Sequence, residues 1–396
     1  MKLKSKSKSV LAIIFVLFIA ISGVLSVLSN PIKIFGGLAR GYLNTSQESS
    51  FLEKVGNSFK VFDERINEYF ILHDCFIHSY GGIQKLLGRT LINDADKNHE
   101  TVKLNNGHLT FKENYNSDLT GLKDYLINLK SICDSYDSEL LYINKISKNT
   151  TNTELLPDYY PHIYSSNFNE IKPILENNGI LVLDLEEIIT TQNIDKYSLF
   201  YKTDHHWTPQ AGLWVCENIC SAINNMYAWN MDVDIFSIEN YQTKNYPKSF
   251  LGSQGKRVGS LYGEIDDFDV VYPSFQTNLT VNIKDINFNK TGNFYETMIH
   301  EKNNITPDKL LNQEGTAYAA YMQGNHSIVN IQNNNIFSGK TALIVMDSYG
   351  CVVAPYLALV FEKLDCIDIR EYSDSLEDYI KSTSPDIVIY AITSHQ

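Results

Sequence analysis

The chain has no basic stripe, no internal repeat and no low-complexity tract in its 396 residues. Its formal net charge is −13, and removing the four lysines among the first eight residues leaves −17 for the rest (−13 − 4 = −17). So acidic a chain repels polyanions, which excludes nucleic acid as a partner and favours neutral or weakly charged ligands. Hydrophobic residues make up 43% and aromatic residues 12% of the sequence, which excludes a disordered chain and predicts a packed core.

Cysteine is scarce as well, with six residues and no C-x-x-C spacing. Cys216 and Cys220 stand four residues apart on a predicted helix and could meet there. Free thiols packed in the core are nevertheless the favoured interpretation. The sequence predicts neither a cofactor nor a metal site.

One long apolar run occupies residues 10–28 and follows Lys2, Lys4, Lys6 and Lys8. Its length is roughly enough to cross a bilayer core of about 30 Å, and the lysines would stay in the cytosol. We therefore expect residues 1–29 to be a signal anchor or signal peptide. The A-x-A cleavage pattern is absent, which favours a retained single-pass anchor in the cell membrane, whereas a cleaved segment would give a secreted protein. Either way, the remaining chain is expected to be extracytoplasmic.

Residues 30–60 predict a mixed, helix-prone stalk that Gly36, Gly37 and Gly41 make poorly regular. Residues 61–396 are then expected to form one large domain. There, helical and strand patterns alternate, which predicts a doubly wound, mostly parallel α/β sheet. Strands are expected at 140–143, 180–185, 341–346, 366–369 and 387–391, and helices at 119–136, 167–177, from 208 on, at 352–361 and at 376–380. An inserted β-rich region of antiparallel strands is expected at about 235–338.

The most informative stretch is YKTDHHWTP, from Tyr201 to Pro209. Asp204 and His206 are two residues apart, so in an extended loop both side chains point to the same side. A carboxylate in this position can hold the imidazole in one tautomer and stabilise its charged form. His205 would point away and is expected to be a packed or hydrogen-bonded residue beside Trp207.

A nucleophile for this pair is available at Ser348, which follows the apolar run 341–346. Its hydroxyl is expected at a strand-to-helix turn, close to backbone N–H groups that could stabilise an oxyanion. Serine needs a base within hydrogen-bond reach, and His206 fits that role. Gly324 and Asn325 precede the serine strand, and a Gly-Asn turn can bring a backbone N–H and a side-chain amide toward a tetrahedral intermediate. Together with Tyr349, they are the candidate oxyanion and substrate-binding residues.

Two possible metal sites remain as alternative interpretations. His73, Asp74 and His78 could suggest a metal site, but an aromatic packing face with polar edges is the favoured interpretation. A metal hydrolase using Asp204, His205 and His206 is disfavoured because adjacent histidines cannot easily bind one ion.

The TDHHWT string, followed in order by Gly324-Asn325-His326 and Asp347-Ser348-Tyr349, resembles the DHHW protein family. That family is similar to the SGNH-like alginate O-acetyltransferases of bacterial envelopes, in which the Asp and His also precede the Ser. The resemblance covers most of residues 60–396 and implies an SGNH-hydrolase-like sheet. It implies further that Asp204, His206 and Ser348 form a triad, and that an acyl group, expected to be acetyl, is moved on a cell-envelope or exported polysaccharide.

We therefore expect an extracytoplasmic serine-dependent O-acyltransferase or esterase with a polysaccharide acceptor. Its acyl donor would be delivered by a multispanning membrane acyltransferase, because free acetyl-CoA is not expected outside the membrane. The alternative is a non-catalytic glycan-binding accessory of such a membrane system. The sequence does not distinguish transfer from hydrolysis.

Overall fold

A computed structural model describes residues 2–45, 49–93, 100–112, 119–149, 152, 154–157, 168–305, 310, 316–337 and 339–392. The predicted helix start at residue 167 and the predicted end of the insertion at residue 338 lie outside these ranges. The chain divides into two compact units, Met1–Leu87 and Gly88–Gln396, and each is described by itself. The domain limits expected at residues 29 and 60 stay predictions.

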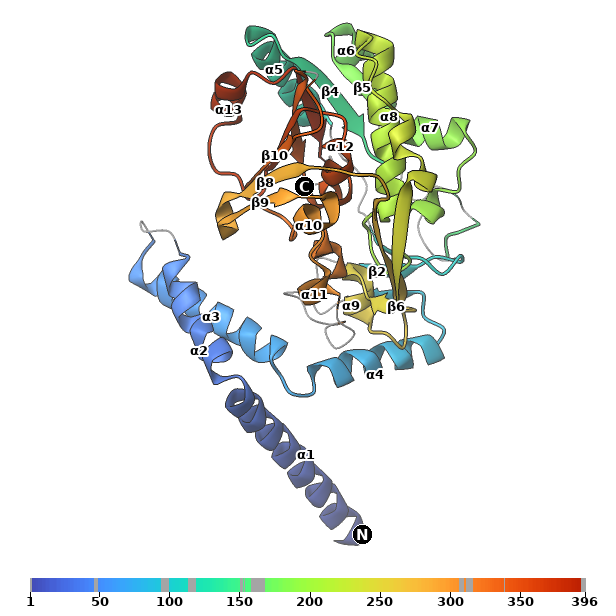
Figure 1. The fold of residues 1–396 in the computed structure, drawn as a ribbon. Coiled ribbons are helices and arrows are strands. Elements are labelled where there is room, and N and C mark those ends of the chain that lie inside the picture. Colours follow the sequence, from blue (N-terminus) through green and yellow to red (C-terminus); the bar gives the residue numbers. More distant parts are fainter. Residues whose placement is uncertain are drawn as a thin grey trace. The chain divides into compact units, whose positions relative to one another are not determined.

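The first unit consists of the helices α1 (Lys2–Ser29), α2 (Pro31–Leu43), α3 (Phe51–Glu68) and α4 (His73–Leu86) (Figure 1). In α1, the window Ala12–Ser29 has a mean hydropathy of 2.7. Among the described residues, it is the one helix long and apolar enough to cross a membrane. The predicted N-terminal membrane segment therefore forms a helix of suitable length and composition.

Most of residues 30–60 lie in α2 and α3, which are regular helices that pack against each other. The predicted helical character is confirmed, whereas the predicted irregularity is wrong, and the stalk itself stays a prediction. The glycines make this packing close. A Cβ built on Gly41 would lie 2.6 Å from the carbonyl oxygen of Asn57, and one on Gly37 would lie 3.2 Å from that of Val61. The glycines thus serve the contact between the two helices instead of interrupting them.

The second unit contains an eight-stranded sheet. In sheet order, its strands are β5 (Leu181–Asp184), β4 (Glu139–Asn144), β13 (Ile387–Ala391), β11 (Thr341–Met346), β12 (Lys363–Asp368), β10 (Ile328–Asn333), β8 (Leu279–Ile283) and β9 (Phe288–Gly292). The pairs from β5 to β12 are parallel, and those from β12 to β9 are antiparallel. The prediction of a mostly parallel sheet is confirmed, and part of the β-rich insertion extends this sheet at one edge.

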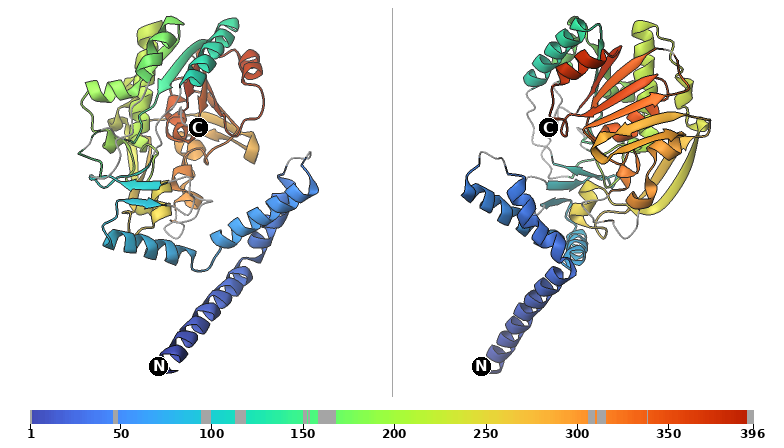
Figure 2. Two further views of the ribbon diagram at one scale, coloured as in Figure 1. Left: turned by 180° about the vertical axis from the view of Figure 1, so that it is seen from behind. Right: turned by 60° about the vertical axis from the view of Figure 1, so that its left-hand side comes forward.

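Helices cover both faces of this sheet, so the doubly wound architecture is confirmed. Strand side chains alternate between the faces, as the two-residue period of a strand requires. In β11, Ile344 packs into the core under α8 (Pro209–Tyr227), whereas Leu343 packs into the core under α5 (Thr120–Ser135), α6 (Phe168–Asn177) and α13 (Leu376–Thr383). Figure 2, right, shows the teal α5 and red α13 on one side of the strands and the yellow-green α8 on the other.

Two smaller sheets complete the unit. One is formed by β1 (Leu91–Asn93), β2 (Glu100–Lys103) and β3 (Leu109–Phe111), and the other by the antiparallel pair β6 (Tyr241–Phe250) and β7 (Asp266–Pro273). The remaining α-helices are short: α7 (Leu185–Thr191), α9 (Ser253–Val258), α10 (Phe294–Met298), α11 (Glu301–Asn304) and α12 (Ala354–Leu357). Within the described ranges, the 3₁₀ turns are η1 (Lys196–Leu199), η2 (Asp234–Phe236), η3 (Ile238–Asn240), η4 (Lys284–Ile286), η6 (Ala317–Ala320) and η7 (Ser348–Val352).

The helix expected over residues 352–361 is wrong in its extent. The chain forms the 3₁₀ turn η7 and then only the four residues of α12. Pro355 is accommodated in the first turn of α12 and lacks the backbone N–H that a helix running from residue 352 would use there, which disfavours one continuous helix. Residues 352–361 are all buried, and tertiary packing therefore decides their conformation.

Candidate active site

Ser348 lies at the carboxyl end of β11, which pairs with β13 on one side and β12 on the other. The apolar run of β11 is buried, so the turn that follows emerges at the edge of the sheet where ligands bind in such folds. Asp347 caps the turn η7 by accepting a hydrogen bond from the backbone N–H of Tyr349 at 3.1 Å. Ser348 is half-buried and begins this turn, as the sequence predicts.

Asp204 and His206 lie in a loop closed by a β-bridge between Phe200 and Trp207. Helix α8 begins directly after it, with the Thr208 hydroxyl as its N-cap and Pro209 in its first turn. These signals were visible in the sequence, because a hydroxyl cap followed by proline is typical of a helix start. The rigid helix and the bridge together fix the loop at both ends.

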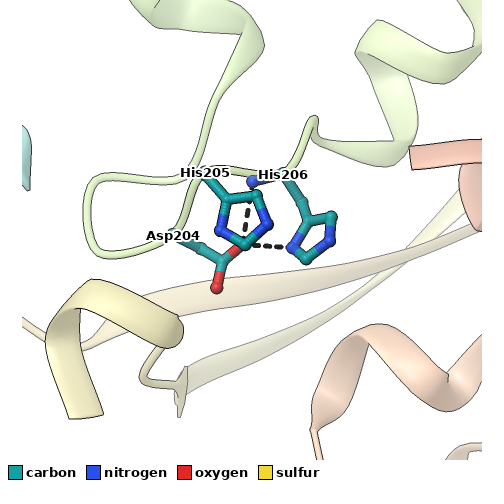
Figure 3. Close-up of side chains that lie close together, drawn as sticks. All are labelled: Asp204, His205 and His206. Carbon is teal, nitrogen blue, oxygen red and sulfur yellow. Dashed lines mark hydrogen bonds and ion pairs between the residues drawn. The ribbon is translucent and has the colours of Figure 1, made fainter. Parts of the chain in front are cut away.

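The three residues meet in space. His206 Nδ1 contacts the Asp204 carboxylate, and His206 Nε2 lies 2.8 Å from Ser348 Oγ. The Asp204 carboxylate also accepts the backbone N–H groups of His206 and Ser253. Figure 3 shows Asp204 directed at His206, with the two dashed contacts between them. The result is an unbroken hydrogen-bonded chain from carboxylate to imidazole to hydroxyl.

The Asp204 carboxyl is buried, with 3% of its surface exposed. Burial by itself raises its pKa, but the charges of His206 and His205 and the hydrogen bonds from His206 lower it well below the usual range. Asp204 therefore carries its negative charge at neutral pH. This charge can stabilise an imidazolium on His206.

His205 faces a different partner, because its Nδ1 lies 2.8 Å from the Ser253 hydroxyl. Its ring packs on His206 with centroids 3.9 Å apart. Burial and the neighbouring His206 lower the pKa of His205 to about 3, so this ring is neutral at working pH. The expectation of a packed or hydrogen-bonded His205 agrees with these contacts. The expectation that His205 points away from the pair is wrong, because its Nδ1 lies 3.8 Å from the Asp204 carboxylate.

The ligand atoms of Asp204, His205 and His206 lie within 4.8 Å of one another, a spacing that a metal ion also requires. In this arrangement, however, both ring nitrogens of His206 already contact oxygen atoms of Asp204 and Ser348. The geometry thus fits a hydrogen-bonded triad better than a metal centre, which usually has four ligands.

Aromatic rings enclose the imidazole of His206. Tyr318 of η6 stacks on it with centroids 4.4 Å apart, and Tyr349 lies 5.2 Å away on a tilted ring. The Tyr349 hydroxyl donates a hydrogen bond of 2.9 Å to the carbonyl of His205, which ties the serine turn to the histidine loop. Tyr318 was not singled out in the sequence because nothing local marks it, since its partner is more than a hundred residues away.

Gly324 and Asn325 lie in a strained turn, in which Met322, Gln323 and Gly324 all have positive φ. The Gly324 N–H donates to the Tyr321 carbonyl at 3.0 Å, so it is not free for a ligand. Asn325 is exposed, and its Oδ1 accepts a hydrogen bond from the thiol of Cys351, three residues after Ser348. Asn325 therefore lies beside the serine turn, with its Nδ2 group unpaired among the described residues.

The cysteines are all free thiols. Cys216 and Cys220 are buried in the core along α8 and are not joined, as the favoured interpretation held. Cys75 is the exposed member of the six.

Part of this chain is similar in sequence to a known family. Residues 134–249 match the family model of the SGNH hydrolase-like domain of the acetyltransferase AlgX. The match spans 116 of the 396 residues, and this segment is similar to an SGNH hydrolase-like domain. The matched segment includes β4, β5 and the loop with Asp204 and His206, and ends before the strand that leads to Ser348.

Solved structures share this fold at low sequence identity. A DHHW family protein from Eubacterium siraeum is 19% identical with a TM-score of 0.53, covering 77% of this chain and 94% of its own. PatB1 from Bacillus cereus is 17% identical with a TM-score of 0.57, and the alignment covers 77% of this chain and 95% of PatB1. The structure of PatB1 with a sulfonyl adduct is also 17% identical, with a TM-score of 0.56, and covers 74% of this chain and 94% of its own. No curated protein matches the chain. The predicted resemblance to DHHW and SGNH-like acetyltransferases is confirmed.

Proposed function

We propose that this protein is an extracytoplasmic serine-dependent O-acyltransferase, moving acetyl groups, or an esterase, with Asp204, His206 and Ser348 as its triad. The observation that carries the proposal is the continuous contact from Asp204 through His206 to Ser348, with 2.8 Å between His206 Nε2 and Ser348 Oγ. The match to an acetyltransferase domain supports the reaction class.

The first half-reaction forms an acyl-enzyme. His206 Nε2 accepts the Ser348 proton as Oγ attacks the acyl carbonyl carbon, and Asp204 stabilises the resulting imidazolium through Nδ1–H. The tetrahedral intermediate then collapses, and its leaving group takes the proton from His206. Ser348 now carries the acyl group as an ester.

In the second half-reaction, an acceptor hydroxyl takes the place of the leaving group. His206 removes its proton while the oxygen attacks the acyl carbon, and Ser348 leaves and regains the proton. A sugar hydroxyl gives transfer, whereas water gives hydrolysis. The same residues serve both, so the outcome depends on which hydroxyl reaches the ester.

The negative charge on the intermediate oxygen needs hydrogen-bond donors. The backbone N–H of Ser348 has no partner among the described residues, and the Asn325 Nδ2 group lies beside the same turn. We assign the oxyanion site to these two donors. Tyr349 borders it, and Gly324 contributes through its positive φ, which shapes the turn before Asn325.

A polysaccharide of the cell envelope, or one being exported, is the proposed acceptor. The apolar window Ala12–Ser29 of α1, which follows four lysines, supports a single-pass protein of the cell membrane with an extracytoplasmic catalytic unit, or a secreted protein if α1 is removed. An acyl group must then arrive from the cytosol, which a multispanning membrane acyltransferase would accomplish.

The test compares Ser348→Ala with wild type on p-nitrophenyl acetate, with mass spectrometry of the protein and of added envelope oligosaccharides. We expect an acetyl adduct at Ser348, acetylated sugar, and less than about 1% of wild-type turnover in Ser348→Ala, because triad deletions cost several orders of magnitude. Ser253→Ala is the matched control: its hydroxyl contacts His205 instead of His206, and activity should persist.

Other outcomes of this experiment would indicate a different function. Acetate release without acetylated sugar would identify an esterase. If no Ser348 adduct formed and the variant equalled wild type, the catalytic assignment would be lost and the glycan-binding accessory favoured. Loss of activity on adding a chelator would point to a metal hydrolase instead.

A further inference from the structure

Two buried lysines stand directly after strand β4. Lys145 is the first residue beyond the strand and Lys148 the fourth, with 8% and 4% of their surfaces exposed. They lie at the carboxyl edge of the parallel strands, the edge from which Ser348 emerges after β11. Buried lysines are rare unless they are paired, so their partners indicate what they do.

Lys148 donates to three backbone carbonyls of the loop that carries the acid and the base. Its Nζ lies 2.6 Å from the carbonyl oxygen of Tyr201, 3.0 Å from that of Lys202 and 2.7 Å from that of Asp204. These three contacts use all three N–H groups of the ammonium. Among the described residues, no carboxylate lies within ion-pair distance of it.

These carbonyls converge because the chain turns around the ammonium just before His206. Without the ammonium, these carbonyl oxygens would lose their common donor in the interior, which costs free energy. The Lys202 carbonyl would keep the hydrogen bond from the Leu109 N–H, whereas the Asp204 carbonyl has no second donor among the described residues. The carbonyl of Asp204 belongs to the residue whose carboxylate contacts His206. Lys148 therefore fixes the backbone from which the acid projects.

The surroundings of Lys148 make its charge sensitive to pH. Burial lowers the pKa of Lys148 to about 7, and the charges of Asp204 and Asp266 act in the opposite direction. His108, in the turn before β3, and His205, in the loop, also face Lys148, and burial lowers the pKa of each to about 3. Both imidazoles are neutral at working pH, so the two carboxylates are the charges that hold the proton on Lys148.

Lys145 reaches the other half of the site. Its Nζ lies 2.6 Å from the Asp347 carboxylate, with 2% of each side chain exposed, and 4.5 Å from the centre of the Tyr349 ring. Asp347 also caps the turn that begins at Ser348. The lysine thus holds the residue just before the nucleophile and the ring just after it.

We propose that Lys145 and Lys148 are positioning residues that together keep His206 and Ser348 in contact. Lys148 acts through the Asp204–His206 loop, and Lys145 acts through the Ser348 turn. This inference rests on the proposed function, in which the 2.8 Å contact between His206 and Ser348 carries the proton transfer. Small displacements matter here, because a shift of about 1 Å can cost on the order of 100-fold in rate.

The test uses the full chain in detergent micelles with two readouts. Hydrogen–deuterium exchange of peptides spanning residues 200–208 reports the order of the loop, whatever the function. The rate at which phenylmethylsulfonyl fluoride modifies Ser348, followed by mass spectrometry from pH 6 to 9, reports the alignment of the triad. The variants are Lys148→Met, Lys148→Arg and Lys145→Met. Lys172→Met is the matched control, since Lys172 pairs with Glu187 on the surface.

We expect Lys148→Met to raise exchange in residues 200–208 and to slow sulfonylation at least tenfold, with partial recovery in Lys148→Arg. Lys145→Met should slow sulfonylation but leave exchange of the loop near wild type. In wild type the rate should fall as pH rises above about 7, because neutral Lys148 loses one of its three donors. In Lys148→Arg, which stays charged, this alkaline decline should be absent.

If Lys148→Met matches Lys172→Met in both exchange and labelling, the proposed role of Lys148 is wrong. Sulfonylation of Lys145→Met at the wild-type rate would remove the role of Lys145. If wild-type Ser348 is never modified, the proposed function fails instead. The exchange of residues 200–208 would then decide by itself whether Lys148 orders the loop.

Discussion

Gly252 lies so close to Asp204 that no side chain fits between them. A Cβ built on Gly252 would come within 2.1 Å of the Asp204 Cβ and 2.3 Å of its Oδ2. The next residue, Ser253, donates its backbone N–H to the same carboxylate. The β6–α9 corner therefore forms the wall against which Asp204 rests, and it fixes the carboxylate on the side opposite His206.

Gly252→Ala should displace Asp204 from His206 and reduce kcat/KM at least 100-fold. The overpacked contact should also lower the free energy of unfolding by about 1–3 kcal/mol. Ester hydrolysis and thermal unfolding measure the two effects. Gly121→Ala, in the exposed first turn of α5 with open space around it, is the control and should leave activity unchanged. An active Gly252→Ala variant would show that the position of Asp204 is not critical.

His206→Ala should lose at least about 10³-fold in kcat, because His206 contacts both Asp204 and Ser348. His205→Ala should lose far less, since His205 contacts Ser253 and its lowered pKa of about 3 keeps it neutral. Steady-state hydrolysis of p-nitrophenyl acetate by both variants decides the matter. Equal losses, or a larger loss in His205→Ala, would make His205 the base.

Apolar runs and helix-capping residues predict the elements that depend on neighbouring residues in the sequence. The apolar runs 341–346 and 387–391 became β11 and β13 with the expected bounds, because strands buried on both faces need continuous hydrophobic sequence. The Thr208-Pro209 start of α8 was likewise visible. The meeting of Asp204, His206 and Ser348 could be expected because their chemistry requires it, although 142 residues separate His206 from Ser348.

What could not be predicted depends on contacts between distant segments. Gly37 and Gly41 looked like interruptions of a stalk, whereas they allow α2 and α3 to pack. Nothing local in the sequence marks Lys148, and only the folded chain shows its three carbonyl partners more than fifty residues away. Tyr318 carries no local signal either. The helix predicted over residues 352–361 does not form as one element, and Pro355, which lacks a backbone N–H, lies where α12 begins.

Tyr318 should support His206 through its ring and not through its hydroxyl. The ring stacks on the imidazole at 4.4 Å, while the buried hydroxyl has no hydrogen-bond partner among the described residues. Tyr318→Phe should therefore keep kcat within about twofold and not lower stability, because it removes an unsatisfied polar group. Tyr318→Ala should reduce kcat at least tenfold and cost about 3–5 kcal/mol of stability. A large loss in Tyr318→Phe would instead give the hydroxyl a role in catalysis.

The stability of the fold should depend on Lys148 in a defined pH window. Burial lowers the pKa of Lys148 from 10.5 to about 7, so between these values the unfolded chain binds a proton that the folded chain does not. The free energy of unfolding then rises with pH across this window, by at most about 1.4 kcal/mol per pH unit from this group. Below about pH 7 both states are protonated, and the contribution is constant.

Urea unfolding of wild type and Lys148→Met at pH 6.5, 7.5, 8.5 and 9.5 isolates this contribution, because the other groups titrate in both proteins. The stability of wild type relative to Lys148→Met should increase with each step above pH 7. Lys172→Met should give a flat difference, since the hydrogen bond with Glu187 raises the pKa of Lys172 and its titration moves above this range. A flat difference for Lys148→Met as well would mean that the buried ammonium keeps its proton throughout, and that the carbonyls of Tyr201, Lys202 and Asp204 stabilise the charge more than its burial disfavours it.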